Sequence, residues 1–198
     1  MKKALFTLFI GLSFLAYSQD YVDINSHIPI NKDVKIGKLE NGLTYYIRQN
    51  SMPANKVELR LVVNAGSILE TDAQRGLAHF MEHMNFNGTK NFQHNDLVDY
   101  LQSIGVKFGQ HLNAYTSFDE TVYILPLPSD DAEKLDKGFD ILEDWAFNCL
   151  LTPEEIDKER GVVLEELRLG LGADQRMLAE YLPKMMYDSQ YAKRLPIG

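Results

Sequence analysis

The stretch GLAHFMEHMNF (residues 76–86) carries the pattern H-x-x-E-H, formed by His79, Glu82 and His83. Its apolar residues recur at helical spacing, which predicts a helix over residues 75–86. Two imidazoles four residues apart on a helix lie close enough to bind one tetrahedral metal ion. Glu82 precedes the second histidine, so its carboxylate points past the metal, where it suits a general base.

The two sides of this helix differ in chemistry. At about 100° per residue, His79, Glu82, His83 and Phe86 fall on one side. The other side is apolar, and we expect it to pack on a sheet. That side consists of Leu77, Phe80, Met81 and Met84.

A long helix is predicted over TPEEIDKERGVVLEELRLG (152–170). Thr152 is placed to cap it, Pro153 takes the first helical position, and Glu155 completes the pattern of a capping box. Its apolar face also carries two glutamates, Glu159 and Glu166. A carboxylate on a buried face is costly unless it is paired or binds a metal.

A two-histidine hydrolytic metal site needs a third protein ligand and one open position. Glu166 shares a face with Ile156, whereas Glu165 points about 180° away from Ile156 by the same helical arithmetic. We therefore predict Glu166 as the third ligand. Glu159, two turns earlier, is placed to hydrogen-bond a ring nitrogen of a metal-binding histidine without binding the metal itself. Pairing of these glutamates with the neighbouring Lys158 and Arg160 is the simpler alternative.

The N-terminal 18 residues have the pattern of a secretory signal peptide. A basic start is followed by the apolar run ALFTLFIGLSFLAY (4–17) and a cleavage site with Ala16 and Ser18 at its small-residue positions. The run is short for a membrane span, which needs about 20 residues. A buried N-terminal helix is the alternative. We expect export to the periplasm or the medium, an irregular lead-in over 19–34, and no membrane span after signal removal.

Charge and cysteine content exclude several classes of protein. Without residues 1–18 the chain has 18 basic and 28 acidic side chains, so we expect no nucleic-acid partner. The one cysteine, Cys149, cannot form an internal disulfide and is interpreted as a small buried apolar residue. His27, His94 and His111 have no partner at ligand spacing and are interpreted as ordinary polar residues, although His111 would be able to line a cleft.

Strand and helix patterns alternate along the rest of the chain. Asn41-Gly42 indicates a hairpin within 36–48. Because strands, hairpins and helices are mixed, we predict an α+β fold with a largely antiparallel sheet packed against helices. The remaining predicted elements are strands over 55–66, 106–116 and 120–128 and helices over 95–105, 129–148 and roughly 174–188.

Four motifs in order give the chain a resemblance to the pitrilysin family of zinc metallopeptidases, which includes insulin-degrading enzyme and the mitochondrial processing peptidase. The H-x-x-E-H of these enzymes is the reverse of the usual zinc-protease motif. The motifs cover most of residues 35–198. They are GLAHFMEHMNFNGT (76–89), LNAYTSFDETVYI (112–124), ERGVVLEELR (159–168) and RLPIG (194–198).

The resemblance implies a zinc endopeptidase that cleaves peptides or unfolded polypeptides with one Zn²⁺ per chain. It implies zinc ligands at His79, His83 and Glu166, a catalytic base at Glu82, a supporting glutamate at Glu159, and a substrate-binding edge strand at Asn113 and Ala114. The gap between His83 and Glu166 is slightly longer than the family's, so Glu159 remains a rival ligand.

The resemblance also implies that residues 35–198 are an N-terminal metal-binding peptidase domain that is incomplete at its C-terminus. Further domains or a partner subunit would then close over the substrate. The alternative is a catalytically inactive family member, or a fragment, that binds peptides or serves as a partner subunit.

Overall fold

A computed structural model describes residues 26–93, 96–106 and 113–198. The chain divides into two units, residues 1–50 and 51–198. No helix in the described part of the chain is both long and apolar enough to cross a membrane. The predicted signal peptide lies outside the described residues, as do His94 and His111, while His27 is exposed.

The described part of the first unit is a hairpin. Strands β1 (Val34–Lys38) and β2 (Thr44–Arg48) pair antiparallel from Val34 opposite Arg48 to Lys38 opposite Thr44. Gly42 has a φ of +94° in the turn, a conformation that side chains with a Cβ rarely adopt. Asn41 supports the same turn because its side-chain oxygen accepts the N–H of Leu43. The hairpin expected from Asn41-Gly42 is confirmed.

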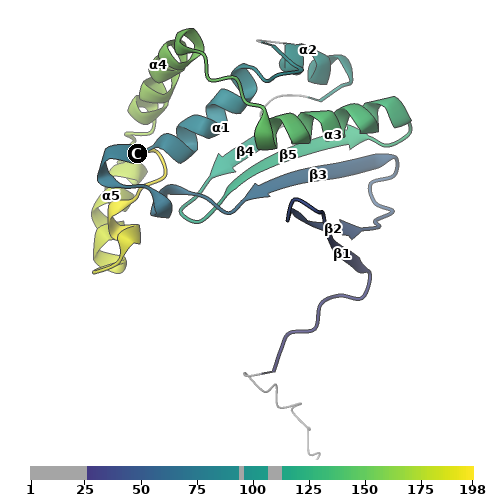
Figure 1. Cartoon of the computed structure of the whole chain (residues 1–198). Coiled ribbons are helices and arrows are strands. Elements are labelled where there is room, and N and C mark those ends of the chain that lie inside the picture. Colours follow the sequence, from purple (N-terminus) through teal and green to yellow (C-terminus); the bar gives the residue numbers. More distant parts are fainter. Residues whose placement is uncertain (1–25, 94–95, 107–112) are drawn as a thin grey trace, which may run out of the picture. The chain divides into compact units, whose positions relative to one another are not determined.

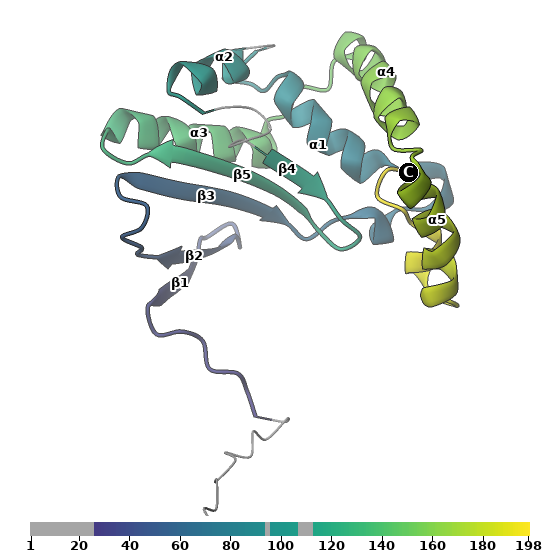
Figure 2. The same ribbon diagram turned by 180° about the vertical axis from the view of Figure 1, so that it is seen from behind.

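A three-stranded antiparallel sheet organises the second unit. Its order is β3 (Lys56–Val63), β5 (Thr121–Pro128) and β4 (Asn113–Thr116), so β5 is central. Every second residue of β5 from Tyr123 to Leu127 is buried on the side that carries the core. Helices α1 (Leu77–Asn87) and α3 (Ala132–Phe147) lie over one face of this sheet (Figures 1 and 2).

The core lies between this sheet face and the helices. Tyr123 and Leu125 of β5 pack with Ile141 and Trp145 of α3 and with Leu101 of α2 (Asp96–Ser103). Helix α3 approaches closely at Gly138, where an added Cβ would meet the Leu127 side chain at 2.1 Å. These contacts fix the positions of α3 and β5, and thereby the surface against which α1 packs.

Two further helices follow the core. Helix α4 (Pro153–Leu169) is capped by the Thr152 hydroxyl, which accepts the Glu155 N–H at 3.3 Å, and it packs against α1. Helix α5 (Ala173–Met185) runs on from α4, and the chain ends beside the start of α1 (Figure 1). Short 3-10 helices cover Ser67–Leu69, Asp72–Gln74 and Gln190–Lys193.

The mixed α+β fold and its antiparallel sheet agree with the sequence prediction, but two local predictions differ from the structure. Only Asn113–Thr116 of the predicted strand 106–116 is a strand among the described residues, and 107–112 lie outside them. Leu77 and Met81 of α1, expected to pack on the sheet, are 51% and 37% exposed. The face of α1 that meets the sheet instead carries Phe86, because tertiary packing decides which face of a short helix is covered.

Candidate metal centre

Helix α1 is held in place at its start by an acidic side chain. The Glu70 carboxylate accepts the N–H groups of Gly76 and Ala78, each at 2.9 Å. A negative charge at this end also complements the helix dipole. Gly76 has a φ of +83° and lies against the backbone of Ile197 and Gly198, so a larger residue would be strained and crowded. The first turn of α1 is therefore fixed from two sides.

The last turn of α1 is anchored in the core. The Trp145 indole N–H donates to the Asn85 carbonyl at 3.1 Å, and the Asn85 side chain donates to the Tyr123 hydroxyl at 2.8 Å. Phe86 packs edge-on against Trp145. Burial raises the pKa of the Tyr123 hydroxyl, which therefore stays protonated at neutral pH. With both ends fixed, the side chains between them have little freedom to shift.

Two imidazoles and one carboxylate converge between α1 and α4. The Nε2 atoms of His79 and His83 are 3.2 Å apart. One Glu166 oxygen lies 3.6 Å from the first of these nitrogens, and the other oxygen lies 3.1 Å from the second. Within the described residues these three side chains form a group whose ligand atoms all lie within 4.8 Å of one another.

This donor set fits a catalytic zinc ion. Two neutral imidazole nitrogens and a carboxylate are the ligands of many hydrolytic zinc sites, in which a fourth position stays open. His79 is buried, and desolvation lowers the pKa of its imidazole, which favours the neutral ring that a metal requires. The Glu166 side chain is 50% exposed, so the group is accessible from solvent on that side.

Glu159 contacts the opposite nitrogen of His83. Its Oε1 lies 2.7 Å from His83 Nδ1, and its other oxygen accepts the Asn87 side-chain amide. Glu159 is only 7% exposed. A carboxylate there accepts the Nδ1 proton and leaves the Nε2 lone pair facing His79 and Glu166. The two glutamates predicted on one face of α4 thus contact different atoms of the same imidazole.

Glu82 lies beside the group of three and is not part of it. Its side chain is nearly buried, and its Oε2 accepts a hydrogen bond of 2.7 Å from the Thr116 hydroxyl. Thr116 ends β4, the edge strand that also carries Asn113 and Ala114. Asn113 pairs through its backbone with Ile124. The structure therefore brings the predicted catalytic and metal residues to one place, next to the predicted substrate strand.

A cavity of about 490 Å³ opens onto these residues. Ala114 and Thr116 line one side of it, next to Glu82 and the two histidines. Apolar residues of α5 and of the C-terminal segment also line it. These apolar residues are Leu178, Ala179, Leu182, Leu195, Pro196 and Ile197.

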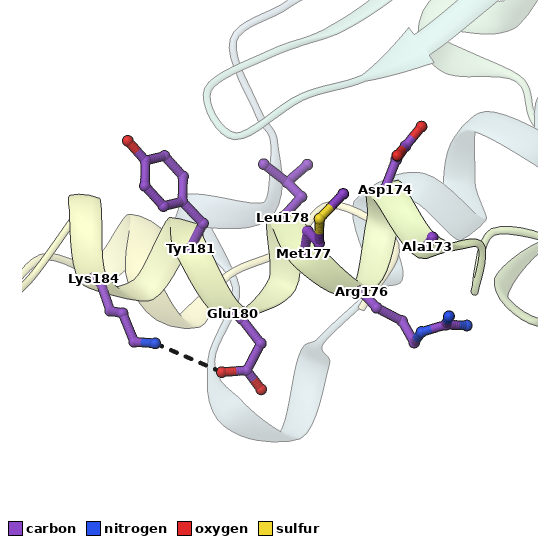
Figure 3. A pocket seen from close by; sticks show the side chains of 8 residues that line it. All are labelled: Ala173, Asp174, Arg176, Met177, Leu178, Glu180, Tyr181 and Lys184. Carbon is purple, nitrogen blue, oxygen red and sulfur yellow. Dashed lines mark ion pairs between the residues drawn. The ribbon is translucent and has the colours of Figure 1, made fainter.

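A larger hollow of about 700 Å³ lies along α5 alone. Figure 3 shows its lining side chains, which project from a single helix, with one ion pair of 3.8 Å between Lys184 and Glu180. No histidine or buried carboxylate lies in it. Of the two hollows, the smaller one beside the histidines therefore has the chemistry of an active site.

Two contacts around the site were not predicted from the sequence. Thr116 stands in the quoted motif LNAYTSFDETVYI, but no spacing rule linked its hydroxyl to Glu82. Arg194 stands in RLPIG and is buried. Its guanidinium donates to the Glu70 carbonyl at 2.8 Å and pairs with Asp72 at 2.9 Å. The signal available in the sequence was an arginine that directly precedes three apolar residues, Leu195, Pro196 and Ile197.

The comparison with family models matches residues 45–196 to Insulinase (Peptidase family M16). The chain belongs to this insulinase family of peptidases. The family resemblance inferred from the four motifs is confirmed. This insulinase-family chain is 39% identical to "Probable zinc protease PqqL" of Haemophilus influenzae in an alignment that covers all of this chain. It is 44% identical to "Zinc protease PQQL-like" of Arabidopsis thaliana in an alignment that covers 82% of this chain. It spans 21% and 17% of these relatives' lengths.

A solved structure supports the same family assignment. The first half of the periplasmic protease PqqL from Escherichia coli matches with a TM-score of 0.84 and 37% identity, covering 87% of this chain and 37% of that one. The insulinase-family chain therefore shares its fold with a protease, and its relatives are named as zinc proteases.

Proposed function

We propose that this protein is an exported zinc endopeptidase that hydrolyses peptide bonds in peptides or unfolded polypeptides. The observation that carries the proposal is the convergence of His79 Nε2, His83 Nε2 and the Glu166 carboxylate, with the Glu82 carboxylate next to them. Zinc in this family is also supported by the names of its relatives.

In this proposal, His79, His83 and Glu166 hold one Zn²⁺ per chain. A zinc ion bound there would lower the pKa of water toward 7 and would polarise the scissile carbonyl. Glu159 keeps the Nδ1 proton on His83 and so holds the ring in the ligating tautomer. Glu166 is preferred to Glu159 as ligand because both of its oxygens face the Nε2 atoms.

Glu82 is the proposed general base. Its carboxylate takes a proton from the attacking water and passes it to the leaving amine. Its burial beside the cavity excludes bulk water from one side, while Thr116 holds one of its oxygens. The second oxygen remains available for the proton transfer.

Substrate is proposed to add to the edge of the sheet at β4. Among the described strands, β4 pairs only with β5, so the other edge of Asn113 and Ala114 can accept an extended peptide. Main-chain hydrogen bonds give affinity without strict sequence selection. Ala114 also lines the cavity beside the histidines, which brings a peptide on this edge close to Glu82.

The whole enzyme is proposed to be larger than the part that holds the metal. The relatives are about five times longer than this chain, which supports further domains or a partner subunit that closes over the substrate. Export is supported by the signal-peptide pattern of residues 1–18 and by the periplasmic location named for the Escherichia coli relative.

The test is a pair of measurements on wild type and Glu82→Gln, namely zinc content by elemental analysis and cleavage of an unfolded protein. We expect one zinc per chain in both proteins, and a fall in turnover of roughly 10²–10⁴-fold in the variant, the contribution typical of general-base catalysis. Glu165→Gln, an exposed residue paired with Arg168, is the matched control and keeps both properties. Full activity of Glu82→Gln contradicts the proposal. Zinc in the wild type with no turnover favours the peptide-binding alternative.

A further inference from the structure

The hydroxyl of Thr116 has a defined place beside the proposed base, Glu82. It donates to Glu82 Oε2 at 2.7 Å and lies 3.4 Å from the Thr121 hydroxyl across the hairpin. A hydroxyl has one proton to donate. The carboxylate oxygen is closer and more negative than the hydroxyl oxygen, so that proton is committed to Glu82.

The neighbouring hydroxyl cannot compete for Glu82. Thr121 donates its own proton to the Ala65 carbonyl at 2.9 Å, and a carbonyl has no proton to return. Each of the two threonine hydroxyl protons therefore has its own acceptor. Among the described side chains, Thr116 is the one whose hydroxyl contacts the Glu82 carboxylate.

Thr116 is also held at a rigid point of the backbone. It is paired with Thr121 at the end of β4, and the turn that follows is closed by the Ser117 N–H donating to the Glu120 carbonyl at 2.8 Å. The same turn is pinned from outside, because the N–H groups of Ser67 and Ile68 donate to the carbonyls of Ser117 and Phe118 at 3.1 and 2.9 Å.

Residues 66–68 lie too close to the turn over residues 117–120 to allow this turn to shift. Gly66 lies so near that an added Cβ would fall 2.4 Å from the Ser117 carbonyl oxygen. The backbone that carries the Thr116 hydroxyl is therefore fixed relative to the segment before α1.

We infer that Thr116 is a positioning residue for Glu82: its hydroxyl turns the carboxylate so that one oxygen is held by the edge strand and the other faces the cavity. The inference rests on the proposed function in one respect, the role of Glu82 as the base. A carboxylate at the end of a flexible side chain samples several rotamers, and one charge-assisted hydrogen bond from a fixed donor selects among them.

The positioning also links the base to the strand proposed to bind substrate. Thr116 follows Ala114 on β4 by two residues, so the two side chains point to the same face of the sheet. A peptide paired with β4 and the carboxylate of Glu82 are thus located relative to the same short strand. Removing the hydroxyl leaves the main-chain groups of β4 unchanged, so peptide docking is retained while the base loses its orientation.

The experiment compares Thr116→Val, Thr116→Ala and Thr116→Ser with wild type in the full-length protein. Thr116→Val removes the hydroxyl and conserves the side-chain volume, whereas Thr116→Ala removes the hydroxyl and reduces the volume. Thr116→Ser keeps the hydroxyl. We expect kcat to fall roughly 10- to 100-fold in the Val and Ala variants, the loss typical of a misplaced catalytic group. KM, zinc content and thermal midpoint stay near wild type, and Thr116→Ser recovers most of kcat.

A matched control is Thr121→Val. It removes the hydroxyl next door, which contacts Ala65 and not Glu82. It is expected to keep kcat even where it lowers the thermal midpoint. Crystal structures of wild type and Thr116→Ala give a readout that needs no turnover, and we expect the Glu82 carboxylate to leave its wild-type position in the variant.

The inference is overturned if kcat is unchanged in both hydroxyl-free variants, if Thr116→Ser loses as much as Thr116→Ala, or if the Glu82 carboxylate does not move. If the wild type has no peptidase activity, the proposed function fails. The carboxylate position in the two crystal structures then decides the inference by itself.

Discussion

Two regions of this molecule hold a carboxylate among several polar side chains, and the partners of the two carboxylates are opposite in kind. Asp144 of α3 is completely buried, and its two oxygens accept four hydrogen bonds of 2.6–3.0 Å from neutral groups. The donors are the Thr89 hydroxyl, the Asn91 backbone and side chain, and the Asn148 side chain; we call these residues with Asp144 the Asp144 cluster. Its carboxylate is satisfied by the protein alone.

The metal centre has the reverse arrangement. Glu166 faces two imidazole nitrogens, and the Nε2 atoms of His79 and His83 face each other at 3.2 Å. Lone pairs that point at one another need a proton or a metal cation between them. A carboxylate surrounded by donors thus indicates a structural cluster, whereas a carboxylate surrounded by acceptors indicates a cation site.

The largest expected effect is at the metal centre. Glu166→Ala removes one of the three proposed ligands and should weaken zinc binding on the order of a thousandfold. Glu165→Ala, one residue away on an exposed face, should leave it unchanged. Competition with a chelator measures both affinities. Equal losses in the two variants would show that the face of α4 has been assigned wrongly.

The next effect tests the Asp144 cluster. Asp144→Asn places an amide group against donors, which should cost about 3 kcal/mol of the free energy of unfolding. Asp140→Asn, exposed on the same helix, serves as control and should cost little. Urea unfolding gives both values. The folded Asp144→Asn protein should still bind one zinc, and a selective loss of zinc would show that the two regions are coupled.

A smaller effect is expected at Glu159. Its carboxylate accepts from the His83 imidazole on one oxygen and from the Asn87 side-chain amide on the other, so its partners combine those of Glu166 and of Asp144. Glu159→Gln keeps an acceptor but removes the charge, so zinc affinity should fall about tenfold. Titration calorimetry measures the change. Glu154→Gln, exposed in the first turn of the same helix, is the control. A loss as large as that of Glu166→Ala would make Glu159 the ligand.

The smallest effect uses Cys149 as a reporter of the Asp144 cluster, since its backbone pairs with Thr89. Burial raises the pKa of the Cys149 thiol to about 11. At pH 8 such a thiol is ionised about a hundredfold less than one with a pKa of 9, and only the thiolate is alkylated. Alkylation should therefore be slow in the wild type.

Loosening the cluster should expose the thiol. Asp144→Asn is expected to raise the alkylation rate of Cys149 several-fold, while removal of zinc by a chelator leaves the rate unchanged. The rate is measured by mass spectrometry at pH 8. The structure has Cys149 partly buried, not fully buried as the sequence predicted. Rapid alkylation of the folded wild type would contradict this partial burial.

The elements near the metal were predictable because their signals are local. The helix over 75–86 and the Thr152 cap depend on residues within one or two turns, and the structure places α1 and α4 within two residues of the expected bounds. Of the strand predicted over 106–116, Asn113–Thr116 are in a strand and 107–112 lie outside the described residues. Val106 is in no strand, because short apolar runs do not show the bounds of a strand. The exposed Leu77 and Met81 show the same limit for helix faces.

The sequence by itself determined which residues are the candidates for metal binding and catalysis. Helical periodicity is a property of the chain, so the i, i+4 spacing of His79 and His83 and the seven-residue spacing of Glu159 and Glu166 put each pair on one face before any packing is known. The four ordered motifs were likewise sufficient to indicate the family. None of these inferences required a contact between distant residues.

Only the tertiary structure decided which atoms meet. The 2.7 Å contact of Glu159 with His83 spans 76 positions, and the Thr116 bond to Glu82 spans 34. The Asp144 cluster and the buried Arg194 also join distant segments. Spacing along the chain cannot place such pairs, because helix orientation and sheet register, set by the packing of the core, determine which side chains come within hydrogen-bond distance.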